Sequence, residues 1–428
     1  MAKEISGHAP QIQNRGIRRI DLASAQLASS EIARDINRDI VLELIRFQQP
    51  VARADLSRLS GLRPSTISAI VEQLIAERWI VEGAIVKAPR GRPSTMLAVN
   101  GDMVTFALDM RPDRAILALV DLSGRFLSRE TILTFADPRK TIAQIGKRIR
   151  AIQAEHAGKS FEGLGVSVPG RVHPTTQRVL MAPNLNWHDF DLKGALEKET
   201  NLQVEIDNDA NACLLSELWY GRLQGAKNVV LIAVAEGVGA AILAGGQLHS
   251  GFNGLAGEFG HISVDPRGQL CGCGQKGCWE MESSSRAALR AYQAIAKSTT
   301  VHNFYDLLKL AEDGDVKAMD AIAQQARALG RGLRLVTATL SPELILFAGD
   351  ISAAWDRYRP IVQAELQRTM LAGTVPKLAI AGDAELARLS GSAAMLMQRH
   401  ASYHRSTHHT STSRGLRPIK ESARAKQS

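Results

Sequence analysis

The stretch from Gly257 to Glu280 has the sequence GEFGHISVDPRGQLCGCGQKGCWE, and it holds three of the four cysteines of the 428-residue chain. One nitrogen and three sulfur ligands would complete a tetrahedral Zn²⁺ shell and leave no position for a catalytic water. The glycines between the cysteines permit the tight turns that bring three thiolates together. We therefore predict a structural zinc site made of His261, Cys271, Cys273 and Cys278.

Two other interpretations of these cysteines are weaker. The N-terminus has no apolar signal-peptide core, so the thiols are expected to stay reduced and a disulfide is disfavoured. Buried cysteines without a metal are the remaining alternative. Cys213 lies in an apolar helical pattern and is expected to be a core residue.

Composition places the chain among ordinary globular proteins, with 45% hydrophobic and 22% charged residues. No window holds 18 uninterrupted apolar residues, so we expect a cytoplasmic protein without membrane insertion. The net charge of +9 is uneven. Residues 1–100 carry +4 and residues 399–428 carry +6, whereas the long middle is close to neutral. This distribution favours a basic module attached to a neutral ligand-binding or catalytic body.

Apolar periodicity divides the chain into four parts. Residues 1–34 have no sustained apolar face and are predicted to be a flexible tail, and residues 399–428 form a basic, Ser-, Thr- and His-rich disordered tail. Residues 35–99 are predicted to be one domain and residues 100–398 a second one. In the larger domain strands and helices alternate, which is typical of an α/β body, with two lobes expected from its length.

Residues 35–99 are predicted to form a winged helix-turn-helix. Three short helical patterns come first, with a turn at Gly61 and a proline, Pro64, at the start of the third. Two short strands follow at 79–81 and 96–99, around a polar loop. Three helices followed by a two-stranded wing are typical of this DNA-binding module.

The third helix and the wing carry the candidate DNA-binding residues. Packing the apolar side of that helix leaves small polar residues exposed near its N-terminus, where they can enter a major groove. The wing contains Arg-Gly-Arg-Pro, whose guanidinium groups can lie in a narrow minor groove. The predicted DNA contacts are Ser65, Thr66, Ser68, Gln73, Arg90 and Arg92. A three-helix unit that serves only dimerisation, with a solvated linker, is the alternative.

From about Gly101 to Gln398 the chain resembles the ROK family of repressors, open reading frames and kinases. Three elements carry the resemblance: the Cys-x-Cys-Gly-x-x-Gly-Cys-x-Glu run, the Gly-Glu-x-Gly-His element before it, and the stretch DNDAN at 207–211. The winged helix in front, closed by Gly-Arg-Pro at 91–93, resembles the DNA-binding half of the repressor branch. The resemblance implies a two-lobed, actin-like (ribonuclease H-like) ROK domain with a hexose held in its cleft.

By the same resemblance, a set of polar residues would surround the sugar hydroxyls: Asn184, Asn208, Asp209, Glu258, His261 and Glu280. Carboxylates accept paired hydrogen bonds from neighbouring hydroxyls, so the residue types suit a carbohydrate. Zinc would fix His261, and Cys278 would place Glu280. Asp209 corresponds to the general base of the family's kinases. Without the family, each of these residues is better interpreted as a helix cap or surface acid.

The phosphate loops of the family's kinases are altered in this chain. An Asp-x-Gly-Gly-Thr loop is replaced by Asp-Met-Arg-Pro at 109–112, and Pro112 has no N–H to donate to a phosphate. At the second loop Glu236 takes a position near the phosphates, and a carboxylate about 4 Å from a phosphate charge costs about 4 kcal/mol. Nucleotide binding is therefore expected to be lost, and Asp209 is expected to be a vestigial base.

The sequence thus favours a sugar-responsive transcriptional repressor rather than an enzyme. Its expected partners are operator DNA, a monosaccharide or derivative as effector, and a second copy in a homodimer or dimer of dimers. The main alternative is an ATP-dependent hexose kinase with an accessory DNA-binding module. A third possibility is that a protein, rather than a free sugar, controls DNA binding.

Overall fold

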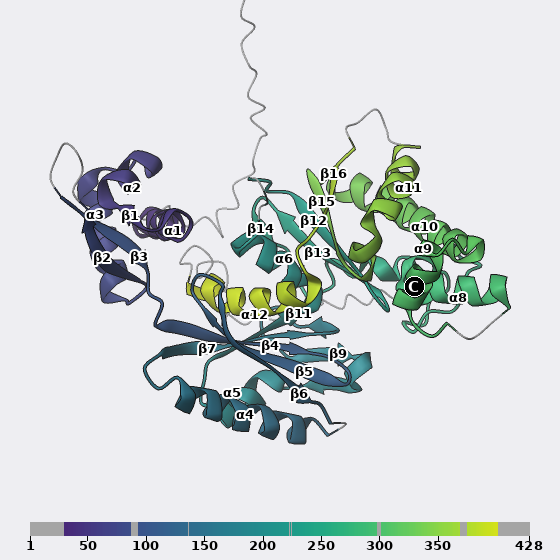
Figure 1. Cartoon of the computed structure of the whole chain (residues 1–428), viewed down its shortest axis with the longest axis horizontal. Coiled ribbons are helices and arrows are strands. Elements are labelled where there is room, and N and C mark those ends of the chain that lie inside the picture. The colour runs from purple at the N-terminus through teal and green to yellow at the C-terminus, as the bar shows by residue number, and fades with distance from the viewer. Residues whose placement is uncertain are drawn as a thin grey trace, which may run out of the picture.

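The computed structural model describes residues 30–86, 93–135, 137–221, 223, 225–297, 301–368 and 375–400. Within these ranges the chain forms a small N-terminal module and a larger body with two five-stranded sheets, and the module lies to one side of the body (Figure 1). The predicted α/β class, with an N-terminal winged helix-turn-helix and a two-lobed body, is confirmed. The residues expected to form the C-terminal tail beyond position 400 lie outside the described ranges.

The N-terminal module has three helices and a three-stranded sheet of order β1-β3-β2. Its elements are α1 (Ser30–Gln48), β1 (Val51–Ala52), α2 (Arg53–Ser60), α3 (Pro64–Ala76), β2 (Ile80–Val86) and β3 (Ser94–Val99). Gly61 ends α2 in the left-handed conformation, with φ at 72°, and Pro64 begins α3. A buried cluster that includes Val41, Ile67 and Leu97 holds the sheet against the helices.

Two details of this module differ from the expectation. The first helix begins at Ser30, within the segment expected to be a tail, because Glu31 and Ala33 favour a helix without needing an apolar face. The wing contains a third strand, β1, which is only two residues long and pairs with β3 at Val51 and Leu97. Periodicity cannot detect a strand of that length.

The first lobe of the body is built on a mixed sheet of order β11-β7-β4-β5-β6. The strands are β4 (Met103–Met110), β5 (Arg114–Asp121), β6 (Phe126–Leu133), β7 (Ser160–Val168) and β11 (Val204–Asn208). Helices α4 (Pro138–Glu155) and α5 (Leu192–Thr200) pack on one face, and α12 (Ala384–His400) crosses the other (Figure 1). A small sheet of order β10-β9-β8 is added by β8 (Arg171–Val172), β9 (Val179–Ala182) and β10 (Trp187–Phe190), and the 3-10 helix η1 (Pro183–Leu185) connects β9 to β10.

The second lobe repeats the arrangement with a sheet of order β14-β13-β12-β15-β16. The strands are β12 (Val229–Val234), β13 (Val238–Ala244), β14 (Gln247–Leu248), β15 (Leu344–Gly349) and β16 (Lys377–Ile380). One face is covered by α8 (Ser285–Ala296), α9 (Phe304–Glu312), α10 (Val316–Leu340) and α11 (Trp355–Gln367). The short elements η2 (Glu258–His261), α7 (Glu280–Ser283) and η3 (Asp350–Ala354) lie in the connections.

Helix α6 (Asp209–Trp219) and α12 connect the two lobes. The two helices approach so closely that a Cβ built on Gly391 of α12 would lie 1.8 Å from the carbonyl oxygen of Ala212 in α6. Only glycine fits there, because any side chain would force the helices apart. The other side of α6 packs against the second sheet through Ala210 and Leu214. The helix pair therefore forms a layer between the sheets.

Candidate functional site

The predicted metal ligands come together in space. The ligand atoms of His261, Cys271, Cys273 and Cys278 all lie within 4.8 Å of one another. The Nδ1 of His261 is 3.5 Å from the Sγ of Cys271, and the Sγ atoms of Cys273 and Cys278 are also 3.5 Å apart. A tetrahedral zinc shell has nitrogen–sulfur and sulfur–sulfur separations of about 3.6 and 3.8 Å. The donor set and its spacing thus fit a tetrahedral zinc ion.

The thiols of this cluster need a cation if they are all to be ionised. Burial is the main factor that raises the pKa of Cys271 and of Cys278. Carboxylate Oε1 of Glu280 lies 3.0 Å from the Sγ of Cys271 and would repel a thiolate there. A bound divalent cation removes both penalties because it compensates the negative charges.

Two glycines place the element that carries Glu258 and His261 directly on strand β13. A Cβ on Gly257 would lie 2.4 Å from the carbonyl oxygen of Ala240, and one on Gly260 would lie 2.2 Å from that of Val238. Gly257 also has φ at 102°, in the region that favours glycine. The Gly-Glu-x-Gly-His spacing therefore exists because the short helix η2 touches a strand backbone at both glycines.

The acidic residues around His261 lie close enough to share one ligand. Oε2 of Glu258 is 3.8 Å from Nε2 of His261, and Oε1 of Glu280 is 3.5 Å from Nδ1. Burial is the main factor that raises the pKa of Glu258, and nearby His261 partly offsets it. A Cβ on Gly237 would lie 3.0 Å from Oε2 of Glu280, so the loop after β12 reaches the same place.

Asn208 and Asp209 stand at the N-terminus of α6, beside the start of β13. A Cβ on Gly239 of β13 would lie 3.6 Å from the Cβ of Ala210. The Oδ1 of Asn208 caps the helix by accepting from the backbone N–H of Asn211 at 2.7 Å, and the Asn208 amide N–H groups have no acceptor within the described ranges. Burial raises the pKa of Asp209, and the charge of Arg388 partly offsets it. We call Asn208, Asp209, Glu258, His261 and Glu280 the carbohydrate side.

The sixth predicted sugar ligand and a residue that the sequence did not indicate lie on the small sheet. Asn184 is exposed on η1, and only the resemblance to the ROK family assigns it to sugar binding. Arg171 of β8 interacts electrostatically with Glu258 and lowers its pKa. The Nε of Arg171 is buried and has no hydrogen-bond partner within the described part of the chain. An isolated arginine after a strand carries no spacing signal, so sequence reasoning missed it.

At the position of the first phosphate loop, charged side chains pair with one another. Asp109 is 1% exposed and accepts hydrogen bonds from Ser167 Oγ at 2.9 Å and from Arg111 Nε at 2.9 Å. Arg388 Nε lies 3.1 and 3.0 Å from the two carboxylate oxygens of Asp109. Arg111 also forms an ion pair with Glu385 at 3.2 Å. Side chains, rather than open backbone N–H groups, therefore occupy this loop.

The second phosphate loop carries acidic side chains. Glu236 follows β12, and its charge contributes to raising the pKa of Asp350 on η3, although burial of Asp350 is the larger cause. The charge of Arg388 acts on Asp350 in the opposite direction. We call Asp109, Arg111, Glu236 and Arg388 the nucleotide side, after the loops that they replace. A polyphosphate would meet two carboxylates and two arginines that are already paired there.

The predicted DNA-binding residues divide into two groups. On α3, Ser65 is exposed and Thr66 is half-buried, whereas Ser68 Oγ donates to the carbonyl oxygen of Pro64 at 3.0 Å. The Nε2 of Gln73 donates to Glu77 at 2.8 Å. The latter two side chains would have to exchange these hydrogen bonds for contacts with DNA. Arg90 and Arg92 lie outside the described residues.

The comparisons with known proteins show the family of the chain. A sequence profile described as the ROK family matches residues 105–399. The xylose repressor of Bacillus subtilis is 29% identical over 329 residues, which cover 76% of this chain and 85% of the repressor. Among the helices of the described ranges, none is long and apolar enough to cross a membrane.

Two solved structures share the fold over different lengths of the chain. One is a ROK family transcriptional regulator, homologous to the MLC protein of Escherichia coli, with 28% identity and a TM-score of 0.73; the match covers 87% of this chain and 100% of that one. The other is a ROK family glucokinase from Streptomyces griseus in complex with glucose and AMPPNP, with 29% identity and a TM-score of 0.61; the match covers 69% of this chain and 99% of that one. The regulator thus matches a longer part of this chain than the glucokinase does.

Proposed function

The chain belongs to the ROK family, and from this premise we propose that it is a sugar-responsive transcriptional repressor. The observation that carries the proposal is the match to a ROK transcriptional regulator over 87% of this chain, against 69% for the glucokinase. The family profile begins only at residue 105, and the winged helix-turn-helix lies before it. As a DNA-binding regulator the protein would act in the cytoplasm.

In the proposed function, residues 35–99 bind operator DNA through Ser65, Thr66, Ser68 and Gln73 on α3 and through Arg90 and Arg92 in the wing. Residues 100–398 bind a monosaccharide or derivative through the carbohydrate side and Asn184. We include a structural Zn²⁺ held by His261 and the three cysteines, and the donors and spacing of this cluster support it. The ion would fix the ring of His261 and, through Cys278, the start of α7 with Glu280.

Helix α6 supports a route from the sugar to the DNA-binding module. Its first residue, Asp209, belongs to the carbohydrate side, and the backbone carbonyl of its last residue, Trp219, accepts a hydrogen bond from Arg46 of α1. The guanidinium carbon of Arg46 also lies 4.9 Å from the ring centroid of Trp219 and 5.3 Å from that of Tyr220. A shift of α6 on sugar binding would therefore act on α1.

The mechanism that follows is a population shift. A sugar that binds better to one lobe arrangement favours that arrangement. In a homodimer or dimer of dimers, this would change the separation of the two α3 helices, which must match half-sites about 34 Å apart. The paired charges of the nucleotide side support the absence of phosphoryl transfer, because nucleotide binding would have to break the Asp109–Arg388 pair.

The test is a DNA-binding measurement with a panel of sugars. Duplexes selected from a random pool by the full chain are labelled, and the affinity is followed by fluorescence anisotropy with and without monosaccharides and their phosphates. We expect specific binding that weakens steeply with salt, as phosphate contacts require, and a change of at least fivefold with one sugar. Equal affinity for all sequences, or no effect of any sugar, would refute the proposal.

A hexose kinase remains the second candidate, because the glucokinase with glucose and AMPPNP shares the fold over 69% of this chain. Retention of Asp209 is the specific observation in its favour. Sugar-dependent release of ADP that disappears in Asp209→Asn would support it over a repressor. The third possibility, that a protein controls DNA binding, is tested by mutating Glu258 and Glu280. Control by a protein partner would persist in these variants, whereas control by a sugar would be lost.

A further inference from the structure

The three thiols of the predicted zinc cluster differ in their exposure to solvent. Cys271 and Cys278 are 3% and 0% exposed, whereas Cys273 is exposed. The Sγ of Cys273 lies 3.5 Å from the Sγ of Cys278. Because a disulfide has an S–S distance of about 2.05 Å, the two sulfur atoms would have to approach by only about 1.5 Å to form one. A thiol that solvent can reach therefore has a buried thiol as its direct neighbour.

The segment that carries Cys273 has room to make this movement. Residues 272–276 are all exposed. A Cβ built on Gly272 or Gly274 would meet no atom of the described residues within 4 Å, chain neighbours aside. The turn is thus not packed against the body, and exposed segments with few packing contacts move at the lowest cost.

Cys278, in contrast, is fixed by the core behind it. The next residue, Trp279, is 1% exposed, and its Nε1 donates to the carbonyl oxygen of Ala328 at 2.9 Å. A Cβ on Gly332 would lie 2.0 Å from the indole, so helix α10 packs directly on the ring. A bond between the two sulfurs would therefore bring Cys273 toward Cys278 without pulling the core apart.

We propose that Cys273 and Cys278 are a site of reversible oxidation by a peroxide, which joins them in a disulfide and releases the zinc ion. His261 and Cys271 would remain as ligands, and two ligands are too few for a structural zinc site, which uses four. Transient disulfides of this kind act as redox sensors in cytosolic proteins. The expectation that the thiols stay reduced then describes the protein in the absence of peroxide.

The oxidation takes two steps. The Sγ of Cys273 attacks one oxygen of hydrogen peroxide, an S–O bond forms, the O–O bond breaks, and the hydroxide that leaves takes up a proton to become water. The Sγ of Cys278 then attacks the Sγ of Cys273, so the S–S bond forms, the S–O bond breaks, and a second hydroxide leaves and is protonated to water. The two thiolates lose two electrons, which the peroxide accepts, and solvent supplies the two protons.

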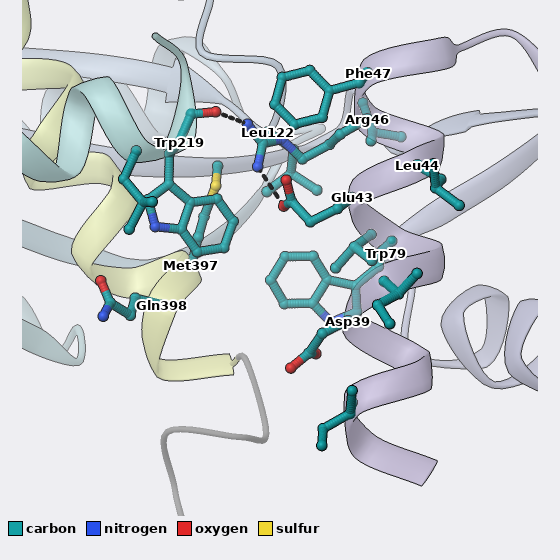
Figure 2. A pocket seen from close by; sticks show the side chains of 15 residues that line it. Asp39, Glu43, Leu44, Arg46, Phe47, Trp79, Leu122, Trp219, Met397 and Gln398 are labelled. Carbon is teal, nitrogen blue, oxygen red and sulfur yellow. Dashed lines mark hydrogen bonds and ion pairs between the residues drawn. The ribbon is translucent and has the colours of Figure 1, made fainter. Parts of the chain in front are cut away.

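The modification would act on the carbohydrate side, and this consequence rests on the proposed function. Loss of the ion would free the ring of His261 beside Glu280. Asp209 of the same side begins α6, and Figure 2 shows the hydrogen bond between the carbonyl of Trp219, at the other end of this helix, and Arg46 of α1. An oxidised chain would therefore still bind DNA but would respond less to sugar.

Treatment of the zinc-loaded full chain with hydrogen peroxide tests the proposal. Zinc release is followed with a chromogenic chelator, free thiols are blocked with N-ethylmaleimide, and tryptic peptides are analysed by mass spectrometry. Trypsin cleaves after Lys276, so the proposed disulfide joins two peptides, residues 268–276 and 277–286, whereas a bond between Cys271 and Cys273 stays within the first.

We expect the joined peptides, with the bond at Cys273 in fragment spectra, and one zinc ion released per disulfide. Dithiothreitol followed by zinc should restore the original zinc content. Zinc that is retained under peroxide, or released without this bond, would overturn the proposal.

Two variants separate oxidation of the exposed thiol from simple loss of a ligand. Cys273→His removes the thiol but keeps a side chain that binds zinc, and peroxide should release zinc from it at least tenfold more slowly. Cys213→Ser changes a buried thiol outside the cluster and should release zinc at the rate of the unaltered chain. Equal rates in Cys273→His and the unaltered chain would overturn the proposal. If Cys273→His does not load zinc, the disulfide map of the unaltered chain decides.

The outcomes also distinguish this inference from the proposed function. A chain that holds zinc and keeps it under peroxide overturns the inference alone, whereas a chain that never holds zinc overturns the metal site and the inference together. In the anisotropy assay, the effect of sugar on DNA affinity should fall at least threefold after oxidation and return with dithiothreitol and zinc. An unchanged effect would overturn the regulatory role, and no effect even in the reduced chain would refute the proposed function while the disulfide map still stands.

Discussion

The two sides of the cleft carry similar residue types, but their charged groups have different partners. On the nucleotide side, Asp109 accepts hydrogen bonds from Arg388 and Arg111, so its charge is compensated within the protein. On the carbohydrate side, Glu258 is half-buried, its pKa is raised by burial, and its nearest basic atom is the imidazole Nε2 at 3.8 Å. A side whose charges are paired internally has little to offer a ligand, whereas incompletely compensated carboxylates favour hydroxyl donors.

The difference suggests how a kinase fold can serve as a sensor. The Asp109–Arg388 and Asp109–Arg111 contacts give the nucleotide side an internal network of paired charges. The proposed sugar ligands include Asp209 at the start of α6, so under the proposed function occupancy could be transmitted along that helix. Substitutions that weaken one of the two sides, or the contact between the body and the DNA-binding module, test this difference.

The largest effect is expected from the metal ligands. Cys278→Ser removes one of three thiolates and should abolish stoichiometric zinc, with a loss of at least about 5 kcal/mol in the free energy of unfolding, because structural zinc sites contribute about 10–16 kcal/mol in small domains. Zinc content by plasma mass spectrometry and the melting temperature are measured together. Cys213→Ser is the control, since this buried cysteine lies outside the cluster. Full zinc content in Cys278→Ser would contradict the site.

The next effect concerns the nucleotide side. Arg388→Leu leaves Asp109 buried with a weaker set of partners and should destabilise the body by about 3 kcal/mol, the lower end of what breaking a buried ion pair costs. The matched control is Arg368→Leu, whose side chain is 71% exposed and pairs with Glu365 at 3.2 Å, and whose loss should cost less than about 1 kcal/mol. Urea unfolding gives both values. Similar losses would mean that Asp109 does not depend on Arg388.

These two sides were predictable from the sequence to different extents. The cysteine spacing and the Gly-Glu-x-Gly-His element indicated a cluster that the structure brings together, because short-range motifs fix their own geometry. The altered loop at 109–112 predicted that phosphates lose their donors, but Arg388 lies 279 residues after Asp109. A pair so distant in sequence has no local pattern, so only the fold reveals it.

The same limit applies to the secondary-structure elements and to the exposed face of α1. The apolar runs at 103–109 and 229–235 each predict a strand, and the structure has β4 at Met103–Met110 and β12 at Val229–Val234. Strand β6 (Phe126–Leu133) was missed because its exposed, polar residues give little apolar signal. Strand β16 (Lys377–Ile380) was missed because it has only four residues. Ile40 belongs to the apolar pattern of the first helix together with Val41, Leu44 and Ile45, yet it is 42% exposed, since periodicity defines a face but not its partner.

On the carbohydrate side, Glu258→Gln should weaken binding of the effective sugar by about 2 kcal/mol, roughly 30-fold, because a neutral amide accepts weaker hydrogen bonds from hydroxyls and one of its groups is left unpaired. DNA affinity in the absence of sugar should remain unchanged. Calorimetry with the sugar identified in the anisotropy screen measures the effect. Glu155→Gln, an exposed residue at the end of α4, is the control. If both variants bind sugar normally, Glu258 is not a ligand.

The smallest expected effect lies in the connection between the carbohydrate side and α1. Arg46→Met removes the hydrogen bond to Trp219 and the stacking on Trp219 and Tyr220, but it keeps an apolar side chain of similar length. Sugar affinity and DNA affinity should each stay within about threefold of the unaltered chain. The effect of sugar on DNA affinity should fall by about 1 kcal/mol, roughly fivefold, because coupling energies are about 1–3 kcal/mol in total.

The measurement is a set of anisotropy titrations with DNA at zero and saturating sugar, from which the coupling is the ratio of the two affinities. Arg327→Met on α10, whose side chain is 43% exposed and lies 3.7 Å from Asp320, is the matched control and should leave the ratio unchanged. A loss of coupling only in Arg46→Met would mean that the signal leaves the carbohydrate side through α6. If the ratio is the same in both variants, the sugar signal reaches the DNA-binding module by contacts other than Arg46.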